Sequence, residues 1–124
     1  MKFAKAIFLV AGVWGVLLLT PLYFIFDMIG VQDPPPITHP AFYYGFAGLG
    51  LAWQVAFFII ARDPLRLRPM MIPSILEKIG YGGAVVVLYL LGRMHTQDLA
   101  FGIADLIFAA LFVAAYVATG KPPR

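Results

Sequence analysis

The chain of 124 residues contains no cysteine and few charged residues. Without cysteine it can form no disulfide bond, thiolate metal site or thiol nucleophile. Charged residues make up 12% of the sequence, against about 25% in a typical soluble domain. The two histidines, His39 and His95, lie far apart in the sequence and cannot by themselves hold a haem or a zinc ion. We therefore expect no metal and no cofactor.

Hydrophobic residues, by contrast, make up 62% of the chain. A soluble fold of this size has too much surface for so few polar side chains to cover. This composition argues against a soluble enzyme, a disordered tail or a nucleic-acid-binding module. The net charge of +3 is better explained by membrane topology than by binding of nucleic acid. The sequence therefore predicts an integral membrane protein.

Four apolar stretches divide the chain, at about 4–26, 41–61, 75–92 and 99–119. Each is long enough to cross a hydrocarbon layer of about 30 Å as a helix. In lipid every backbone amide must bond internally, so helices are expected. Pro21 should kink the first helix. The prediction is an all-α, single-domain bundle of four membrane-spanning helices.

Polar residues mark the expected helix ends. Asp27 and the proline-rich run 33–36 should stop the first helix and begin an extended connection. Ser74 and Glu77 have the spacing of a capping box that would open the third helix. Asp98 suits the first turn of the fourth helix.

The cations are distributed unevenly over the predicted connections. On one side of the membrane Arg93 is the only cation expected. The other side holds Lys2, Lys5, Arg62, Arg66, Arg68, Lys121 and Arg124, and Lys78 lies close to it. Lys and Arg concentrate in cytoplasmic loops. We expect a multi-pass protein of the bacterial cytoplasmic (inner) membrane with both termini in the cytoplasm.

Small residues recur at four-residue spacing in three of the spans: Gly48, Ala52 and Ala56; Gly80 and Ala84; Ala110, Ala114 and Ala118. Such ridges let membrane helices approach closely. They predict packing within the bundle, or a face for a second copy or a larger complex.

Asp105 is the most informative polar residue. It lies about six residues into the fourth stretch, roughly 9 Å below the membrane boundary. A carboxylate near the centre of a spanning helix costs about 2.5–3.5 kcal/mol and should face the bundle. Arg93 and Tyr89, on the neighbouring helix, are its expected partners, with Tyr23 as a further hydroxyl. Asp105 could serve as a structural pair, a proton-relay or ligand-binding carboxylate, or a protonated neutral group.

The remaining polar residues have structural interpretations. As part of the capping box, Glu77 would lie at the positive end of the helix dipole, and Lys78 could extend to the cytoplasmic headgroups. Gln54 lies at a similar depth, where a hydrogen bond to Glu77 would join two helices. The alternative is that these polar residues, with Asp105, Arg93 and Tyr89, form a ligand site.

The basic loop after the second span carries Arg62, Arg66 and Arg68 among leucines. We expect it to lie in anionic headgroups, or to dock an acidic partner.

Polar residues follow a recognisable order: His39-Pro40, Trp53-Gln54, Arg62-Asp63-Pro64 with Arg66 and Arg68, Glu77-Lys78, Arg93 and Asp105. This order resembles a group of uncharacterised four-span bacterial inner-membrane proteins, and the architecture loosely resembles DoxX-like proteins. The resemblance implies a fold and no activity.

Three functions remain open. The first is a non-enzymatic accessory or structural subunit that works through helix packing in a homo-oligomer or a larger complex. The second is a binder or carrier of a small lipophilic molecule, favoured by eleven phenylalanines and six tyrosines. The third, and least supported, is a lipid-modifying enzyme, because the sequence shows no catalytic constellation. Membrane lipids are the expected surroundings in all three.

Overall fold

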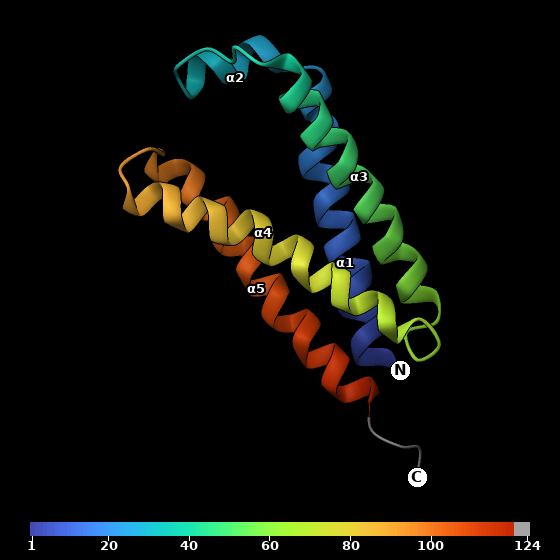
Figure 1. The fold of residues 1–124 in the computed structure, drawn as a ribbon. Coiled ribbons are helices and arrows are strands. Elements are labelled where there is room, and N and C mark those ends of the chain that lie inside the picture. Colours follow the sequence, from blue (N-terminus) through green and yellow to red (C-terminus); the bar gives the residue numbers. More distant parts are fainter. Residues whose placement is uncertain (121–124) are drawn as a thin grey trace.

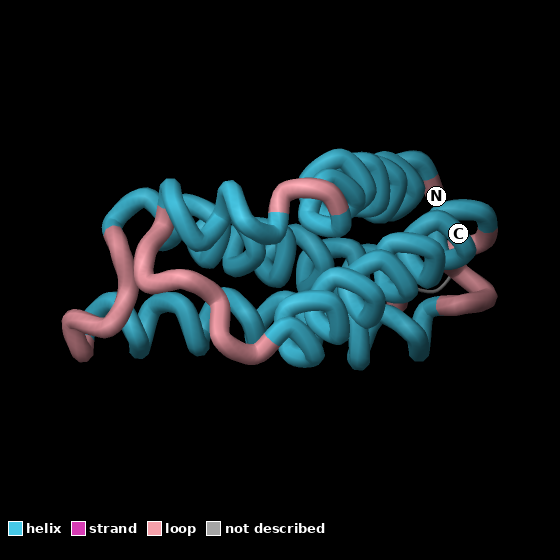
Figure 2. Tube along the Cα trace, turned by 90° about the horizontal axis from the view of Figure 1, so that it is seen from above, coloured by secondary structure: helices cyan, strands magenta, loops and turns pink. Residues whose placement is uncertain are grey.

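The computed structural model describes residues 1–120, which are helical almost throughout and contain no strand. Two short 3-10 helices, η1 (Thr20–Tyr23) and η2 (Arg68–Met70), accompany five α-helices: α1 (Lys2–Leu19), α2 (Phe26–Gln32), α3 (Pro40–Arg62), α4 (Met71–Leu90) and α5 (Thr96–Thr119). Figure 2 shows that the connecting loops are short. Lys121 and Arg124, which entered the charge count, lie outside the described residues.

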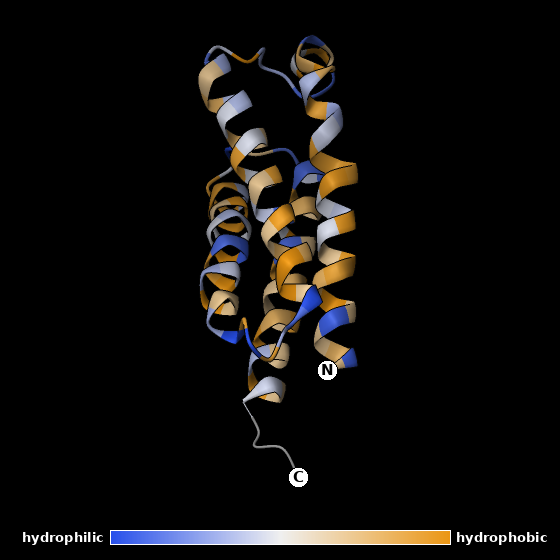
Figure 3. Cartoon of the chain, turned by 90° about the vertical axis from the view of Figure 1, so that its right-hand side faces the viewer, coloured by the Kyte–Doolittle hydropathy of each residue, from blue (hydrophilic) through white to orange (hydrophobic). Residues whose placement is uncertain are grey.

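Four helical segments are long and apolar enough to cross a membrane, which confirms the four predicted spans. They are Lys2–Tyr23, Pro40–Arg62, Arg68–Leu90 and Thr96–Thr119. Figure 3 shows hydrophobic residues along the lengths of these helices, with hydrophilic residues mainly near their ends. Large apolar side chains such as Leu17 and Leu49, each 70% exposed, face outward. The chain is therefore an all-helical, multi-pass membrane protein.

The first span ends differently from the prediction. α1 stops at Leu19, and Pro21 lies in the 3-10 helix η1 that follows, because proline cannot continue an α-helical hydrogen-bond ladder. The stretch from Phe26 is not extended but forms α2. Phe26 anchors this short helix through an edge-to-face contact with Tyr43 of α3, at 5.0 Å between ring centroids.

The long helices form two antiparallel pairs, α1 with α3 and α4 with α5 (Figure 1). α1 also packs against α5, whereas α3 and α4 meet at only a few positions. In Figure 1 the two pairs lie close together at the end where α1 begins and α5 ends, and they diverge toward α2. The start of α1, the α3–α4 connection and the end of α5 therefore share one end of the bundle.

An aromatic cluster joins the two pairs at this end. Phe8 of α1 stacks on Phe112 of α5 at 4.3 Å between ring centroids, and Phe57 of α3 meets Phe112 edge-on at 5.0 Å. All three rings are fully buried. Burying a side chain of this kind stabilises a fold by roughly 1.5–3 kcal/mol in water, while in lipid the gain comes from close packing.

The predicted small-residue ridges do not account for this packing, because several of their members point outward: Ala52, Gly80, Ala84, Ala110 and Ala114 are exposed. Different small residues, Gly82 and Gly102, lie where α4 and α5 cross. A Cβ atom added at Gly102 would lie 2.5 Å from Cγ1 of Val85, so only glycine fits there. The prediction that the ridges pack within the bundle is thus wrong at these positions.

Gly102→Ala should therefore lower the stability of the bundle by about 1–3 kcal/mol, the usual cost of overpacking. Gly80→Ala is the matched control, because an added Cβ meets no atom within 4 Å there and alanine favours a helix by up to about 1 kcal/mol. Thermal unfolding in detergent should give a lower midpoint for Gly102→Ala and an unchanged or higher one for Gly80→Ala. Equal midpoints for both variants would contradict the close crossing.

Candidate functional site

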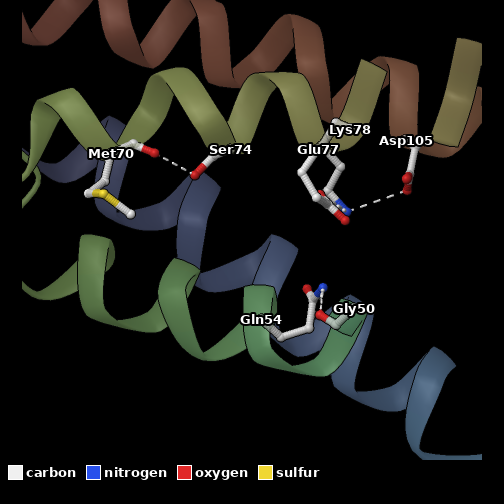
Figure 4. Close-up of polar contacts among 7 residues, drawn as sticks. All are labelled: Gly50, Gln54, Met70, Ser74, Glu77, Lys78 and Asp105. Carbon is white, nitrogen blue, oxygen red and sulfur yellow. Dashed lines mark hydrogen bonds and ion pairs between the residues drawn. The ribbon is translucent and has the colours of Figure 1, made fainter. Parts of the chain in front are cut away.

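Helix α4 begins earlier than its capping-box motif predicts. It starts at Met71 and runs without a break through Pro73 into Ser74. Pro73 is tolerated because the first turn of a helix has amides without intrahelical partners. The Ser74 hydroxyl donates instead to the Met70 carbonyl at 2.7 Å (Figure 4), a contact typical of serine inside a helix. The capping assignment is therefore wrong, and Glu77 becomes an acid within the span.

Lys78 points into the bundle instead of extending to the headgroups, and its side chain is only 4% exposed. Its Nζ lies 3.4 Å from Oδ1 of Asp105 and 3.7 Å from Oε2 of Glu77 (Figure 4). One ammonium thus faces two carboxylates, one on its own helix and one on α5. The predicted headgroup role of Lys78 is wrong, because this buried charge finds its partners inside the protein.

Asp105 faces the interior, as the cost of a carboxylate in lipid predicts, and is 9% exposed. Its partner is Lys78, and no hydrogen bond or ion pair joins it to Arg93, Tyr89 or Tyr23 among residues 1–120. The expected partners were therefore wrong.

The turn between α4 and α5 explains why Arg93 is not the partner. Gly92 has a φ of +74°, and the amides of Gly92 and Arg93 donate to the carbonyls of Tyr89 and Leu88 in a Schellman motif. Arg93 thereby lies beyond the helix end and is exposed. Counting along each arm of the hairpin would have found the correct pair, because Lys78 and Asp105 both lie roughly three turns from this connection.

Gln54 approaches this charged cluster from α3. It is 1% exposed, and its Nε2 donates to the carbonyl of Gly50 at 2.8 Å (Figure 4). The predicted hydrogen bond to Glu77 does not form. Gln54 Oε1 and Glu77 Oε2 are both buried without a hydrogen-bond partner. Buried polar atoms are nearly always paired, so these two acceptors could serve a bound group.

A cavity of about 360 Å³ lies between the two helical pairs and contains this cluster at its inner end. Its walls are mainly apolar, and side chains from all five α-helices line it, among them Trp14, Ile29, Phe46, Tyr81 and Phe101. Ile29 belongs to α2, which lies across the diverging end of the bundle in Figure 1. No sequence pattern predicted these lining residues, because they meet only once the helices are paired.

Side chains from the α4–α5 hairpin hold α2 over the cavity. Nε2 of His95 lies 2.7 Å from the carbonyl oxygen of Pro34 and 3.4 Å from Oδ1 of Asp33. Gln97 also donates to the carbonyl of Gln32, at 3.3 Å. We call these contacts the α2 latch. The pKa of His95 is raised above 6.5, and the main cause is the hydrogen bond to the Pro34 carbonyl. Desolvation lowers this pKa, and the negative charge of Asp33 raises it further.

The basic loop is only partly free to meet headgroups. Arg62 and Arg66 are exposed. Arg68 instead donates from Nε to the carbonyl of Tyr116 at 2.9 Å and lies 3.7 Å above that residue's ring. Arg68 therefore ties the start of α4 to the end of α5.

No group of three His, Cys, Asp or Glu side chains is placed to hold a metal ion in the described part of the chain. Comparison of the chain with protein-family models, with curated proteins and with solved structures gives no match. The cavity and its polar groups are therefore the basis for a functional proposal.

The α2 latch should weaken as pH rises. Because the folded-state pKa of His95 is raised above 6.5, its charged contact with Asp33 is fully formed below that value and is lost as pH passes through the raised pKa. The measurement is the protection of the amides of residues 26–32 from hydrogen exchange, in the wild type and in His95→Gln at each pH. As pH rises, the protection in the wild type should fall to the level of the variant. His39→Gln, which changes an exposed histidine outside the latch, should retain the wild-type pH dependence. Equal protection of wild type and His95→Gln at every pH would contradict the latch.

Proposed function

We propose that the protein binds or carries a small lipophilic molecule in the cavity between its two helical pairs. The observation that carries this proposal is the cavity itself, whose volume of about 360 Å³ falls within the range of known small-molecule sites. Mainly apolar walls with a few convergent polar groups are the usual composition of such sites. Gln54 and Glu77 supply these polar groups at the inner end.

The route of entry also favours a lipophilic ligand. Trp14 and Phe101 line the cavity, are 40% and 38% exposed, and belong to the membrane-spanning helices α1 and α5. The cavity is therefore bordered at these positions by side chains of membrane-spanning segments. A molecule dissolved in the bilayer could enter there without crossing water.

The proposed setting is the bacterial cytoplasmic membrane, with both termini in the cytoplasm. The clustering of cations supports this orientation: Lys2, Lys5, Arg62 and Arg66 lie at the end of the bundle where α1 begins, and Arg93 lies at the other. The α2 latch would then face the outside.

Reporter fusions should test this orientation directly. A reporter placed after Arg68 should be active only in the cytoplasm, and one placed between Asp33 and His39 should be active only outside, because the positive-inside rule fixes both loops. A cytoplasmic signal from the second fusion would reverse the orientation.

An accessory subunit that works through helix packing is the second candidate. The outward-facing small residues Gly80 and Ala84 on α4, and Ala110 and Ala114 on α5, favour it, because small residues let helices from different chains approach closely. In this function the bundle would form a homo-oligomer or join a larger membrane complex.

Native mass spectrometry in a mild detergent distinguishes the two functions. We expect the purified chain to carry an added small-molecule mass. Leu18→Trp should reduce the fraction carrying it about tenfold, because Leu18 lines the cavity and a larger side chain would fill the space. Leu17→Trp, a matched control on the outward face at 70% exposure, should retain it.

The two alternatives predict different spectra. An added mass retained equally by both tryptophan variants would indicate lipid on the outer surface and would contradict a cavity ligand. Multiples of the chain mass, or a co-purifying protein, with no added small molecule would favour the accessory subunit.

A further inference from the structure

The cavity is strongly acidic for a site with apolar walls. Its charged lining comprises four carboxylates, Asp33, Glu77, Asp98 and Asp105, and one ammonium, Lys78. Asp33 and Asp98 lie at the outer end near the α2 latch, whereas the other three form the inner cluster. No second lysine and no arginine lines the cavity in the described part of the chain.

The inner cluster carries one negative charge in excess when its three groups are ionised. Lys78 lies at 3.4 Å from Asp105 and 3.7 Å from Glu77, both longer than a good charge-assisted hydrogen bond of about 2.7–2.9 Å. A single ammonium therefore compensates two carboxylates incompletely. An uncompensated charge at this depth is costly, because membrane interiors and apolar walls solvate it poorly.

Two atoms in the cluster lack a hydrogen-bond partner, and both are acceptors, which defines what a ligand must supply. Gln54 Oε1 and Glu77 Oε2 lack hydrogen-bond partners, and Gln54 is 99% buried with its only donor bond directed to Gly50. In Figure 4 the side chains of Gln54 and Glu77 point toward one another from α3 and α4. A group between them would satisfy both only by donating hydrogen bonds.

A protonated amine meets both requirements, whereas other headgroups meet one or neither. It supplies the missing positive charge and up to three N–H donors. A neutral alcohol donates one hydrogen bond and leaves the charge uncompensated. A carboxylate would be repelled by Glu77 and Asp105, and Lys78 already faces both of these acids. Aromatic rings in the lining, such as Phe46 and Tyr81, can also stabilise a cation.

Resting on the function proposed above, we propose that the cavity selects a lipophilic primary amine, with its ammonium between Glu77 and Gln54 and its hydrocarbon chain along Leu18, Leu22 and Ile25. The acidic outer end at Asp33 and Asp98 further favours cations over anions. The ligand class is thus an amphiphile with one protonated amino group and a short apolar tail.

Four probes with the same tail test this inference on the unmodified cavity: octylamine, octanol, octanoate and octyltrimethylammonium. Binding is followed by the fluorescence of Trp14, which lines the cavity, in a Trp53→Phe protein held in nanodiscs of zwitterionic lipid. The control is a Trp14→Phe protein, in which Trp53 is the remaining tryptophan. Because Trp53 does not line the cavity, its fluorescence records the response to probe dissolved in the bilayer. The headgroup series needs no variant in the site, so it remains informative if site variants fail to fold.

We expect octylamine to bind at least about tenfold more tightly than octanol, the difference that a charge-assisted hydrogen bond makes. Octanoate should not bind, and octyltrimethylammonium, which has the charge but no N–H donor, should bind more weakly than octylamine. Glu77→Gln should reduce octylamine affinity about tenfold and leave octanol affinity unchanged. Asp63→Asn makes the same chemical change at an exposed carboxylate outside the cavity and should leave both affinities unchanged.

The outcomes separate the two proposals. If octanol or octanoate binds as tightly as octylamine, and Leu18→Trp abolishes this binding, the cavity is a lipophilic site without amine selectivity and this inference is overturned. If no probe changes Trp14 fluorescence beyond the Trp14→Phe background, the inference and the proposed cavity function both fail. If Glu77→Gln and Asp63→Asn weaken octylamine equally, the selectivity reflects overall charge and not the placed carboxylate.

Discussion

Three buried phenylalanines hold the two helical pairs together at one end of the bundle, and the rest of the architecture depends on this contact. Phe8, Phe57 and Phe112 come from α1, α3 and α5, and each ring touches the other two. Toward the opposite end, aromatic rings also cluster, but on the α1–α3 side, among Tyr23, Phe26, Tyr43 and Tyr44. The pair formed by Phe46 and Tyr81, with ring centroids 5.4 Å apart, bridges α3 and α4, which otherwise meet at few positions. The pairs diverge toward that end, and the short helix α2 lies across the opening. The cavity lies beyond the phenylalanine cluster, between the two diverging pairs.

The charged cluster is located at the boundary between the packed end and the open end. Lys78 lies 5.3 Å from the centroid of Phe57, which belongs to the aromatic cluster, while Glu77 and Asp105 line the cavity beyond it. Removing one member of a buried ion pair typically costs about 3–5 kcal/mol, so the cluster constrains the register of α4 against α5. Glu77 and Asp105 belong both to the ion-pair cluster and to the lining of the cavity. Helix pairing and ligand recognition would thus share one set of side chains.

Hydropathy predicted the spans correctly, whereas the exact helix ends and the partners on neighbouring helices were predicted wrongly. The apolar stretches predicted four spans, and the cost of a carboxylate in lipid predicted that Asp105 faces the bundle. The Ser74–Glu77 pattern was misread, because serine followed by glutamate three residues later also occurs inside a helix. Once Ser74 is internal, Lys78 moves about a turn away from the headgroups and faces Asp105. The choice of Arg93 as partner rested on charge and neglected the reversal at Gly92.

The sequence by itself determined that the chain lies in a membrane, how many spans it has and that Asp105 faces inward. Each of these depends on hydropathy and helical periodicity within one segment. Only the tertiary structure decided that Lys78 faces two acids, that one acceptor atom each of Gln54 and Glu77 lacks a hydrogen-bond partner, and that Gly80 and Ala84 face outward. These features depend on how far apart two helices lie and how they are rotated about their axes. Side chains such as Val85 against Gly102, and Phe8 against Phe112, set that distance and rotation, and they are adjacent only in the folded chain.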